Sequence, residues 1–143
     1  DYEGELLMDY SSKRLPDTEP IVVFTYDCKL TREIFADVMA ENARYIEEIG
    51  EPIYIIADVR ELQSTFIDML QIMQDAQKEG DGSANDDNIK MLLFVGSSKF
   101  AKMYRNTMQK RGTAFGMAMF EDMDMAIEAA RRDIIYTKRE DAS

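Results

Sequence analysis

The chain has 143 residues, the size of one domain, and its 45% hydrophobic and 31% charged residues exclude wholesale disorder. A net charge of −11 excludes the basic footprint with which proteins bind DNA, RNA or anionic membrane surfaces. The absence of histidine excludes imidazole zinc ligands and Ser-His or Cys-His nucleophiles, and the single cysteine, Cys28, excludes an internal disulfide. We therefore expect an acidic cytoplasmic protein with no membrane insertion, no catalytic machinery and no metal or other cofactor.

The first third of the chain predicts two strands and a helix. Residues 2–10 mix polar and apolar side chains and predict an edge strand, whereas residues 11–20, with two prolines, predict a hairpin loop. Residues 21–26 (Ile-Val-Val-Phe-Thr-Tyr) are strongly β-prone. Thr31 predicts the N-cap of a helix whose apolar residues recur at helical spacing, and Gly50 ends that helix.

The middle of the chain repeats this plan. Residues 53–58 (Ile-Tyr-Ile-Ile-Ala-Asp) predict a buried strand. Thr65 and Asp68 form a Thr-x-x-Asp signature that is typical of a helix start. Gly80 ends the predicted helix, and residues 80–88 predict a flexible connection.

The last third alternates strand and helix once more. Residues 89–95 predict a strand, and the Gly-Ser-Ser turn at residues 96–98 opens a helix. Residues 113–120 alternate small and large side chains, as a strand does. Asp122 caps the last predicted helix, and residues 136–143 are expected to fray as a polar tail.

The order β-β-α-β-α-β-α-β-α predicts one α/β domain over residues 1–135, with a mixed, mostly parallel five-stranded sheet and about four helices. The first two strands should pair antiparallel, and the later ones should run parallel through right-handed crossovers. Both sides of the strands are apolar, as where Ile53 and Ile55 alternate with Tyr54 and Ile56. Either helices cover both faces or a second copy of the chain covers one. We favour self-association, such as a homodimer.

Three junctions carry a resemblance to a known family: residues 55–60 (Ile-Ile-Ala-Asp-Val-Arg), 94–99 (Phe-Val-Gly-Ser-Ser-Lys) and 119–127 (Met-Phe-Glu-Asp-Met-Asp-Met-Ala-Ile). With the element order, they resemble the STAS superfamily, specifically its SpoIIAA-like branch. The last junction is similar to the phenylalanine-acidic-x-x-x-Ala-Ile/Leu ending common there. The resemblance implies a non-catalytic regulatory module that binds a partner protein, with a kinase or a sensor among the candidates.

The best understood members of that superfamily, the anti-sigma-factor antagonists, are switched off when a partner kinase phosphorylates a serine that opens a helix. The matching place here is Ser64 with Thr65. Antagonists usually read Asp-Ser followed by a small residue and glycine, whereas this chain reads Gln63-Ser64-Thr65-Phe66. The resemblance thus implies a phosphoacceptor at Ser64 or Thr65, and the residues themselves favour a plain helix cap.

Partners of open α/β sheets bind beyond the carboxyl ends of the strands. The predicted interaction edge therefore comprises eight residues that follow two strand ends: Asp58, Arg60, Glu61, Gln63, Gly96, Ser97, Ser98 and Lys99. The Gly-Ser-Ser-Lys turn lacks the spacing of a phosphate-binding loop and is interpreted as a turn and cap. Asp58 is expected to pair with Arg60 or to cap local backbone.

Eleven methionines are the oddest feature of the composition. Six lie at core-like positions, which favours gap-filling core residues: Met69, Met73, Met103, Met108, Met117 and Met119. The alternative function is that of a small carrier or sensor that binds an apolar, lipid-like ligand in a Met-lined pocket. Met123 and Met125 near a helix start would then belong to its exposed surface.

Overall fold

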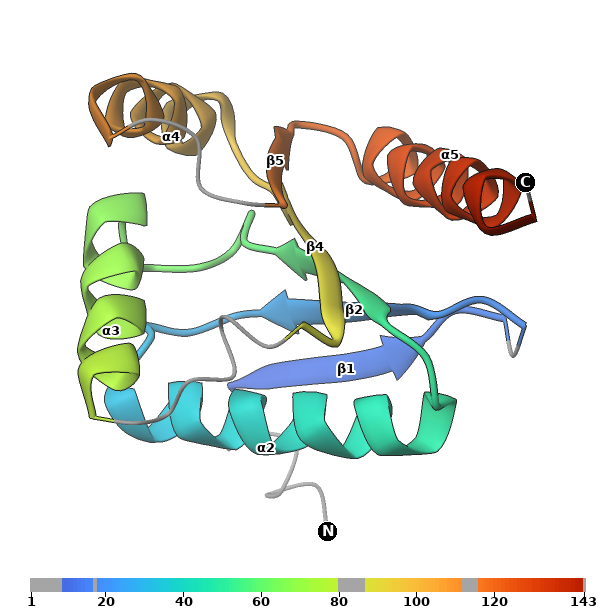
Figure 1. The fold of residues 1–143 in the computed structure, drawn as a ribbon. Helices are drawn as coiled ribbons and strands as arrows, with labels where there is room; N and C mark the ends of the chain where they lie inside the picture. Colours follow the sequence, from blue (N-terminus) through green and yellow to red (C-terminus); the bar gives the residue numbers. More distant parts are fainter. Residues whose placement is uncertain (1–8, 17, 80–86, 112–115, 143) are drawn as a thin grey trace, which may run out of the picture.

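A computed structural model describes residues 9–16, 18–79, 87–111 and 116–142 (Figure 1). The elements follow the predicted order: β1 (Tyr10–Arg14), β2 (Ile21–Tyr26), α2 (Arg32–Ile49), β3 (Ile53–Asp58), α3 (Phe66–Lys78), β4 (Ile89–Val95), α4 (Ser98–Arg111), β5 (Met117–Phe120) and α5 (Met123–Ala142). The strands form a five-stranded sheet in which the spatial order equals the chain order. β1 pairs antiparallel with β2, and all later pairs are parallel, which confirms the predicted fold class.

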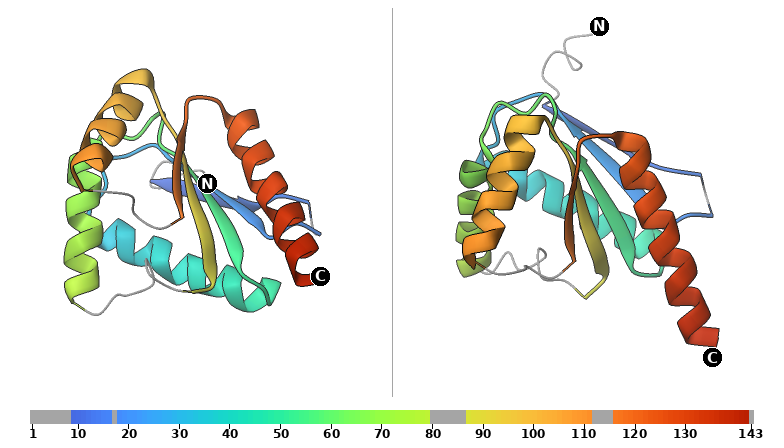
Figure 2. Two further views of the ribbon diagram at one scale, coloured as in Figure 1. Left: turned by 45° about the horizontal axis from the view of Figure 1, so that its top comes forward. Right: turned by 90° about the horizontal axis from the view of Figure 1, so that it is seen from above.

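Helices cover both faces of the sheet, but unequally. Helices α2, α3 and α4 pack on one face, around the aromatic side chains of Phe24, Phe66 and Phe94. Among the described helices, only α5 packs on the other face, where the fully buried Ala126 and Ala130 lie against β2, β3 and β4 (Figures 1 and 2). One chain therefore buries the apolar strands on both sides, as the first of the two predicted alternatives requires. Self-association stays a prediction.

The helix boundaries are set by local capping. At four helix starts a side-chain oxygen accepts the backbone N–H three residues further on, and each of these caps is predicted by the sequence: Thr31, Thr65, Ser97 and Asp122. Gly50 ends α2 in the left-handed conformation (φ 74°), and its N–H donates to the carbonyl oxygen of Ile46. Each cap satisfies a backbone group that the helix terminus leaves unpaired.

The structure corrects two predicted boundaries. Residues 11–14 belong to β1 instead of a loop, because backbone pairing with β2 and the stacking of Tyr10 on Phe24 hold a segment that has almost no apolar pattern. Residues 136–142 continue α5 instead of fraying. The predicted edge-strand residues 2–8, the connection at 80–86 and residues 113–115 of the last predicted strand lie outside the described residues.

Cys28 is buried. Across the described parts of the chain, we find no helix with the length and apolar character needed to span a bilayer.

Candidate functional site

The carboxyl ends of the parallel strands lie along one edge of the sheet, which we call the carboxyl edge: residues 58–65, 96–99 and 120–122. Backbone hydrogen bonds join its segments. The N–H of Val59 donates to the carbonyl of Val95 (2.8 Å), and the N–H of Gly96 donates to the carbonyl of Phe120 (3.0 Å). The N–H of Gln63 also donates to the carbonyl of Cys28 (2.8 Å), which ties the edge to the loop after β2. The edge is therefore a continuous part of the sheet scaffold.

Asp58 pairs with Arg60 at the carboxyl edge, which is one of the two roles that the sequence predicts for it. The Asp58 side chain is only 9% exposed, and its two oxygens accept hydrogen bonds from Nε (2.9 Å) and Nη2 (2.8 Å) of Arg60. The backbone N–H of Arg60 donates to the same carboxylate (3.2 Å). Burial opposes ionisation, but these hydrogen bonds outweigh it and hold the pKa of Asp58 below its ordinary value. The guanidinium is half-exposed and fixed in direction.

The two candidate hydroxyls face different surroundings. Ser64 is 8% exposed, and its Oγ accepts the backbone N–H of Leu30 (2.9 Å), so it joins the loop before α3 to the loop before α2. Thr65 is exposed, and its Oγ1 accepts the N–H of Asp68 (3.1 Å). Both therefore have a structural role, and only the Thr65 side chain is presented at the surface. Phosphorylation of either residue stays a prediction.

The turn after β4 is the second half of the carboxyl edge. A Cβ on Gly96 would lie 2.9 Å from the Cε of Met119 and 3.0 Å from the Cδ1 of Phe100, so a side chain there would crowd both neighbours. The Oγ of Ser97 accepts the N–H of Phe100 (3.2 Å), which confirms the predicted turn and cap. The Oγ of Ser98 donates to Glu121 Oε1 (2.7 Å) and connects this turn to the end of β5.

The predicted edge residues thus fall into two groups, one in the segment 58–65 and one in the segment 96–99. Arg60 is held by Asp58, and the carboxylates of Asp122 and Glu61 act on its charge as well. Among the described residues, no side-chain hydrogen bond or ion pair joins the segment 58–65 to the segment 96–99. Glu61, Gln63 and Lys99 are exposed on this surface. The sequence prediction misses Glu121 and Asp122 as members of the edge, although both directly follow a strand end.

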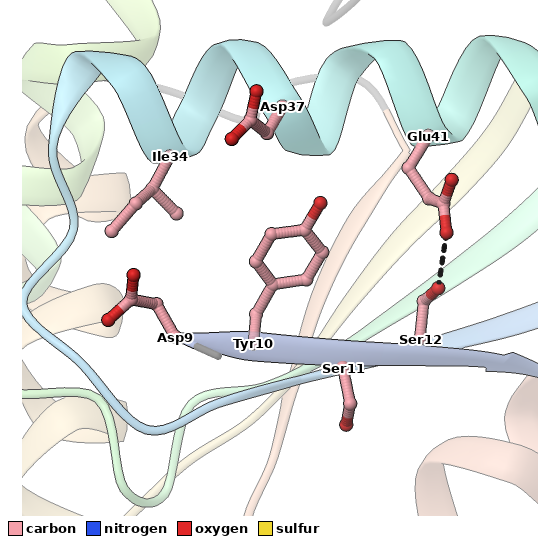
Figure 3. A pocket seen from close by; sticks show the side chains of 7 residues that line it. All are labelled: Asp9, Tyr10, Ser11, Ser12, Ile34, Asp37 and Glu41. Carbon is pink, nitrogen blue, oxygen red and sulfur yellow. Dashed lines mark hydrogen bonds between the residues drawn. The ribbon is translucent and has the colours of Figure 1, made fainter. Parts of the chain in front are cut away.

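A groove between β1 and α2 is a second polar feature, which the sequence prediction misses. Its volume is about 370 Å³, and it is lined by Asp9, Tyr10, Ser11, Ser12, Ile34, Asp37 and Glu41. Figure 3 shows Tyr10 and Ser12 directed toward α2, with Ser11 directed away. The Oγ of Ser12 donates to Glu41 Oε2 (2.9 Å). Burial, together with the carboxylates of Glu41 and Asp37, raises the pKa of Tyr10. The groove depends on the position of β1, which the sequence does not predict.

The methionines mostly pack in the core. Nine of them belong to or pack against the hydrophobic clusters, among them all six that the sequence places there: Met39, Met69, Met73, Met91, Met103, Met108, Met117, Met119 and Met123. Met125 is 61% exposed on α5. The groove beside β1 contains no methionine. The Met-lined pocket for an apolar ligand therefore gains no support from these side chains.

No group of three or more acidic or cysteine side chains within the described ranges is arranged to hold a metal ion. No family model matches the chain, and neither a curated protein nor a solved structure matches it.

Proposed function

We propose that this chain is a non-catalytic interaction module that binds a partner protein with its carboxyl edge. The observation that carries the proposal is the Asp58–Arg60 pair, in which a buried carboxylate fixes a half-exposed guanidinium through two hydrogen bonds and accepts a third from the backbone N–H of Arg60. An oriented arginine loses little side-chain entropy on binding, and arginine is enriched among the residues that dominate protein interfaces. Exposed Gln63, Lys99 and Glu121 would then form the polar rim around it.

The resemblance to the STAS superfamily points in the same direction, because its best understood members work by binding partners. A kinase or a sensor is the expected partner class. In this proposal Thr65 is the better switch of the two hydroxyls, because it is exposed whereas Ser64 is engaged with Leu30. A phosphate on Thr65 would add nearly two negative charges at the start of α3, which the helix tolerates and an acidic partner surface does not.

Affinity purification from the source cells, with quantitative mass spectrometry, tests the proposal. Wild-type protein, Arg60→Glu and the control Arg132→Glu serve as baits; Arg132 forms an exposed pair with Glu128 on α5, on the other face of the sheet. We expect a partner that both wild type and Arg132→Glu enrich and that Arg60→Glu loses. Identical enrichment by all three baits would contradict the proposal.

Two additional baits separate regulation from simple binding. Thr65→Asp should lose the same partner, whereas Thr65→Ala should retain it, because only the first adds negative charge at the rim. Sedimentation velocity of the purified baits shows whether the partner is a second copy of the chain. In that case the wild type is a dimer, and Arg60→Glu is a monomer.

A further inference from the structure

The outer edge of β1 is not paired with any strand of the described sheet, in which β1 is the terminal strand. Two bonds fix which backbone groups point outward: Leu15 N–H to Ile21 O (2.9 Å) and Asp27 N–H to Asp9 O (3.0 Å). Because bonded pairs alternate along an antiparallel ladder, residues 11 and 13 bond to β2 and residues 10, 12 and 14 direct their N–H and C=O groups outward. Such an edge is a template for one more strand.

The side chains above this edge are acidic. Helix α2 runs along β1; Glu41 points from α2 toward Ser12 of β1, and Asp37 lines the same groove (Figure 3). They are four residues apart, which places them about 5–6 Å from each other along the helix. Side chains on one face of a strand repeat about every 6.6 Å. Alternate residues of an added strand would therefore meet Asp37 and Glu41 in turn.

The negative charge of the groove favours a basic binding partner. Its lining includes the carboxylates of Asp9, Asp37 and Glu41 and no basic side chain. Glu41 has Arg44 and Ser12 as partners, whereas neither Asp9 nor Asp37 forms an ion pair with the described residues. Burial raises the pKa of Tyr10 most, and the carboxylates of Glu41 and Asp37 raise it further. A segment that brings cations would neutralise these two carboxylates, which lack an ion pair among the described residues.

We propose that the groove between β1 and α2 binds an extended basic segment of another protein, which adds to β1 as a strand and places lysine or arginine at alternate positions opposite Asp37 and Glu41. This goes beyond the function proposed above, because it concerns a different surface. Strand addition supplies affinity through the main chain, and the alternate side chains supply selectivity.

Other occupants fit the charge less well. A second copy pairing through its own β1 would bring two acidic grooves and two chains of net charge −11 together. The chain's own residues 1–8 are another candidate occupant, but they contain three carboxylates and no lysine or arginine, so their charge does not complement the groove. A nucleic acid would meet the same negative field.

Two peptides of one composition test the alternation: Thr-Val-Lys-Thr-Lys-Val-Thr, with both lysines on one face of a strand, and Thr-Val-Lys-Lys-Thr-Val-Thr, with lysines on opposite faces. We expect the first, labelled and followed by fluorescence anisotropy, to bind more tightly and to weaken as salt rises. The double variant Asp37→Asn, Glu41→Gln should weaken it roughly five- to tenfold. The matched control Asp124→Asn, Glu128→Gln on α5 changes the net charge equally and should leave binding unchanged.

Substitutions of Ser12 test whether the peptide pairs with the main chain of β1. Ser12→Pro removes an outward N–H that β2 does not use, and it should abolish peptide binding while circular dichroism shows a folded protein. Ser12→Ala keeps that N–H and should retain binding. Equal binding of the two peptides, or unchanged binding to the Asp37→Asn, Glu41→Gln variant, would overturn the proposal. A wild-type dimer that Ser12→Pro dissociates would overturn it as well, in favour of a second copy.

Discussion

At the scale of single residues, Asp58 shows how a buried charge orients an exposed one. We expect Asp58→Asn to lower the free energy of unfolding by about 1–2 kcal/mol at pH 7, because a charge-assisted contact with the half-exposed Arg60 is lost. The folded state holds the pKa of Asp58 below that of the unfolded chain, about 3.9. Its contribution is therefore complete above that value and is lost as the pH falls through the folded pKa.

Urea unfolding of wild type and Asp58→Asn from pH 7 to pH 2.5 measures this effect. The difference between the two should shrink below about pH 4, the ordinary range of an aspartate. Asp124→Asn, at an exposed position on α5, is the control and should differ little from wild type at any pH. A wild-type advantage that stays constant to pH 2.5 would show that ionisation of Asp58 is not its source.

The two adjacent hydroxyls give a second prediction. Ser64→Ala leaves the buried N–H of Leu30 without its acceptor and should cost about 1–3 kcal/mol of stability. Thr65→Ala removes an exposed cap and should cost about 1 kcal/mol. Thermal or urea unfolding of both variants gives the comparison. If Thr65→Ala were the more damaging change, Ser64 would not be the residue that joins the two loops.

At the scale of elements, two glycines with positive φ separate backbone strain from crowding. Gly50 (φ 74°) has open space where a Cβ would stand, so Gly50→Ala should cost about 1 kcal/mol through strain alone. Gly116 (φ 56°) precedes β5, and a Cβ there would lie 2.8 Å from the carbonyl oxygen of Lys90 in β4. Gly116→Ala should therefore cost about 2–4 kcal/mol.

Urea denaturation of the two glycine variants provides the measurement. Hydrogen exchange adds a local readout, because the N–H of Leu92 bonds to the carbonyl of Gly116 and should lose protection only in Gly116→Ala. Equal destabilisation by the two substitutions would argue that β5 can move away from β4 at little cost.

Elements whose signals are local could be predicted well. The strands at 21–26, 53–58 and 89–95 have the predicted bounds, because each is an apolar run bounded by a turn or cap. β1 was not predictable in this way. Its residues 11–14 (Ser-Ser-Lys-Arg) are stabilised by pairing with β2 and by contacts to α2, which no local pattern records.

The candidate sites also divide into contacts that are local in sequence, which could be predicted, and contacts between distant residues, which could not. The Asp58–Arg60 contact spans two residues and could be predicted, and the caps at Thr65 and Ser97 lie within three residues of their partners. The bond from Leu30 to Ser64 joins positions 34 residues apart. Such a contact, like the groove beside β1, appears only once the elements are placed in space.

At the scale of the whole molecule, one helix covers a face that three strands share. Ala130 is fully buried where α5 meets the sheet, so Ala130→Leu should push α5 outward and cost about 1–3 kcal/mol. Ala43→Leu makes the same change at an exposed position of α2 and should shift stability by less than about 0.5 kcal/mol. Calorimetric unfolding of both variants tests this, and similar melting temperatures would mean that α5 is loosely docked.

The chain order of the strands also has a consequence for synthesis on the ribosome. Each strand pairs with the strand made just before it, so the sheet can grow in the order of translation. Three helices that cover the first face emerge between the strands, but α5 follows β5. Of the described helices, α5 is the one that packs on the apolar side chains of Ile21, Ile56 and Leu93, and it is the last to leave the exit tunnel. We therefore expect the nascent chain to be most prone to aggregation in the interval before α5 docks, when the apolar surface that α5 covers is still exposed.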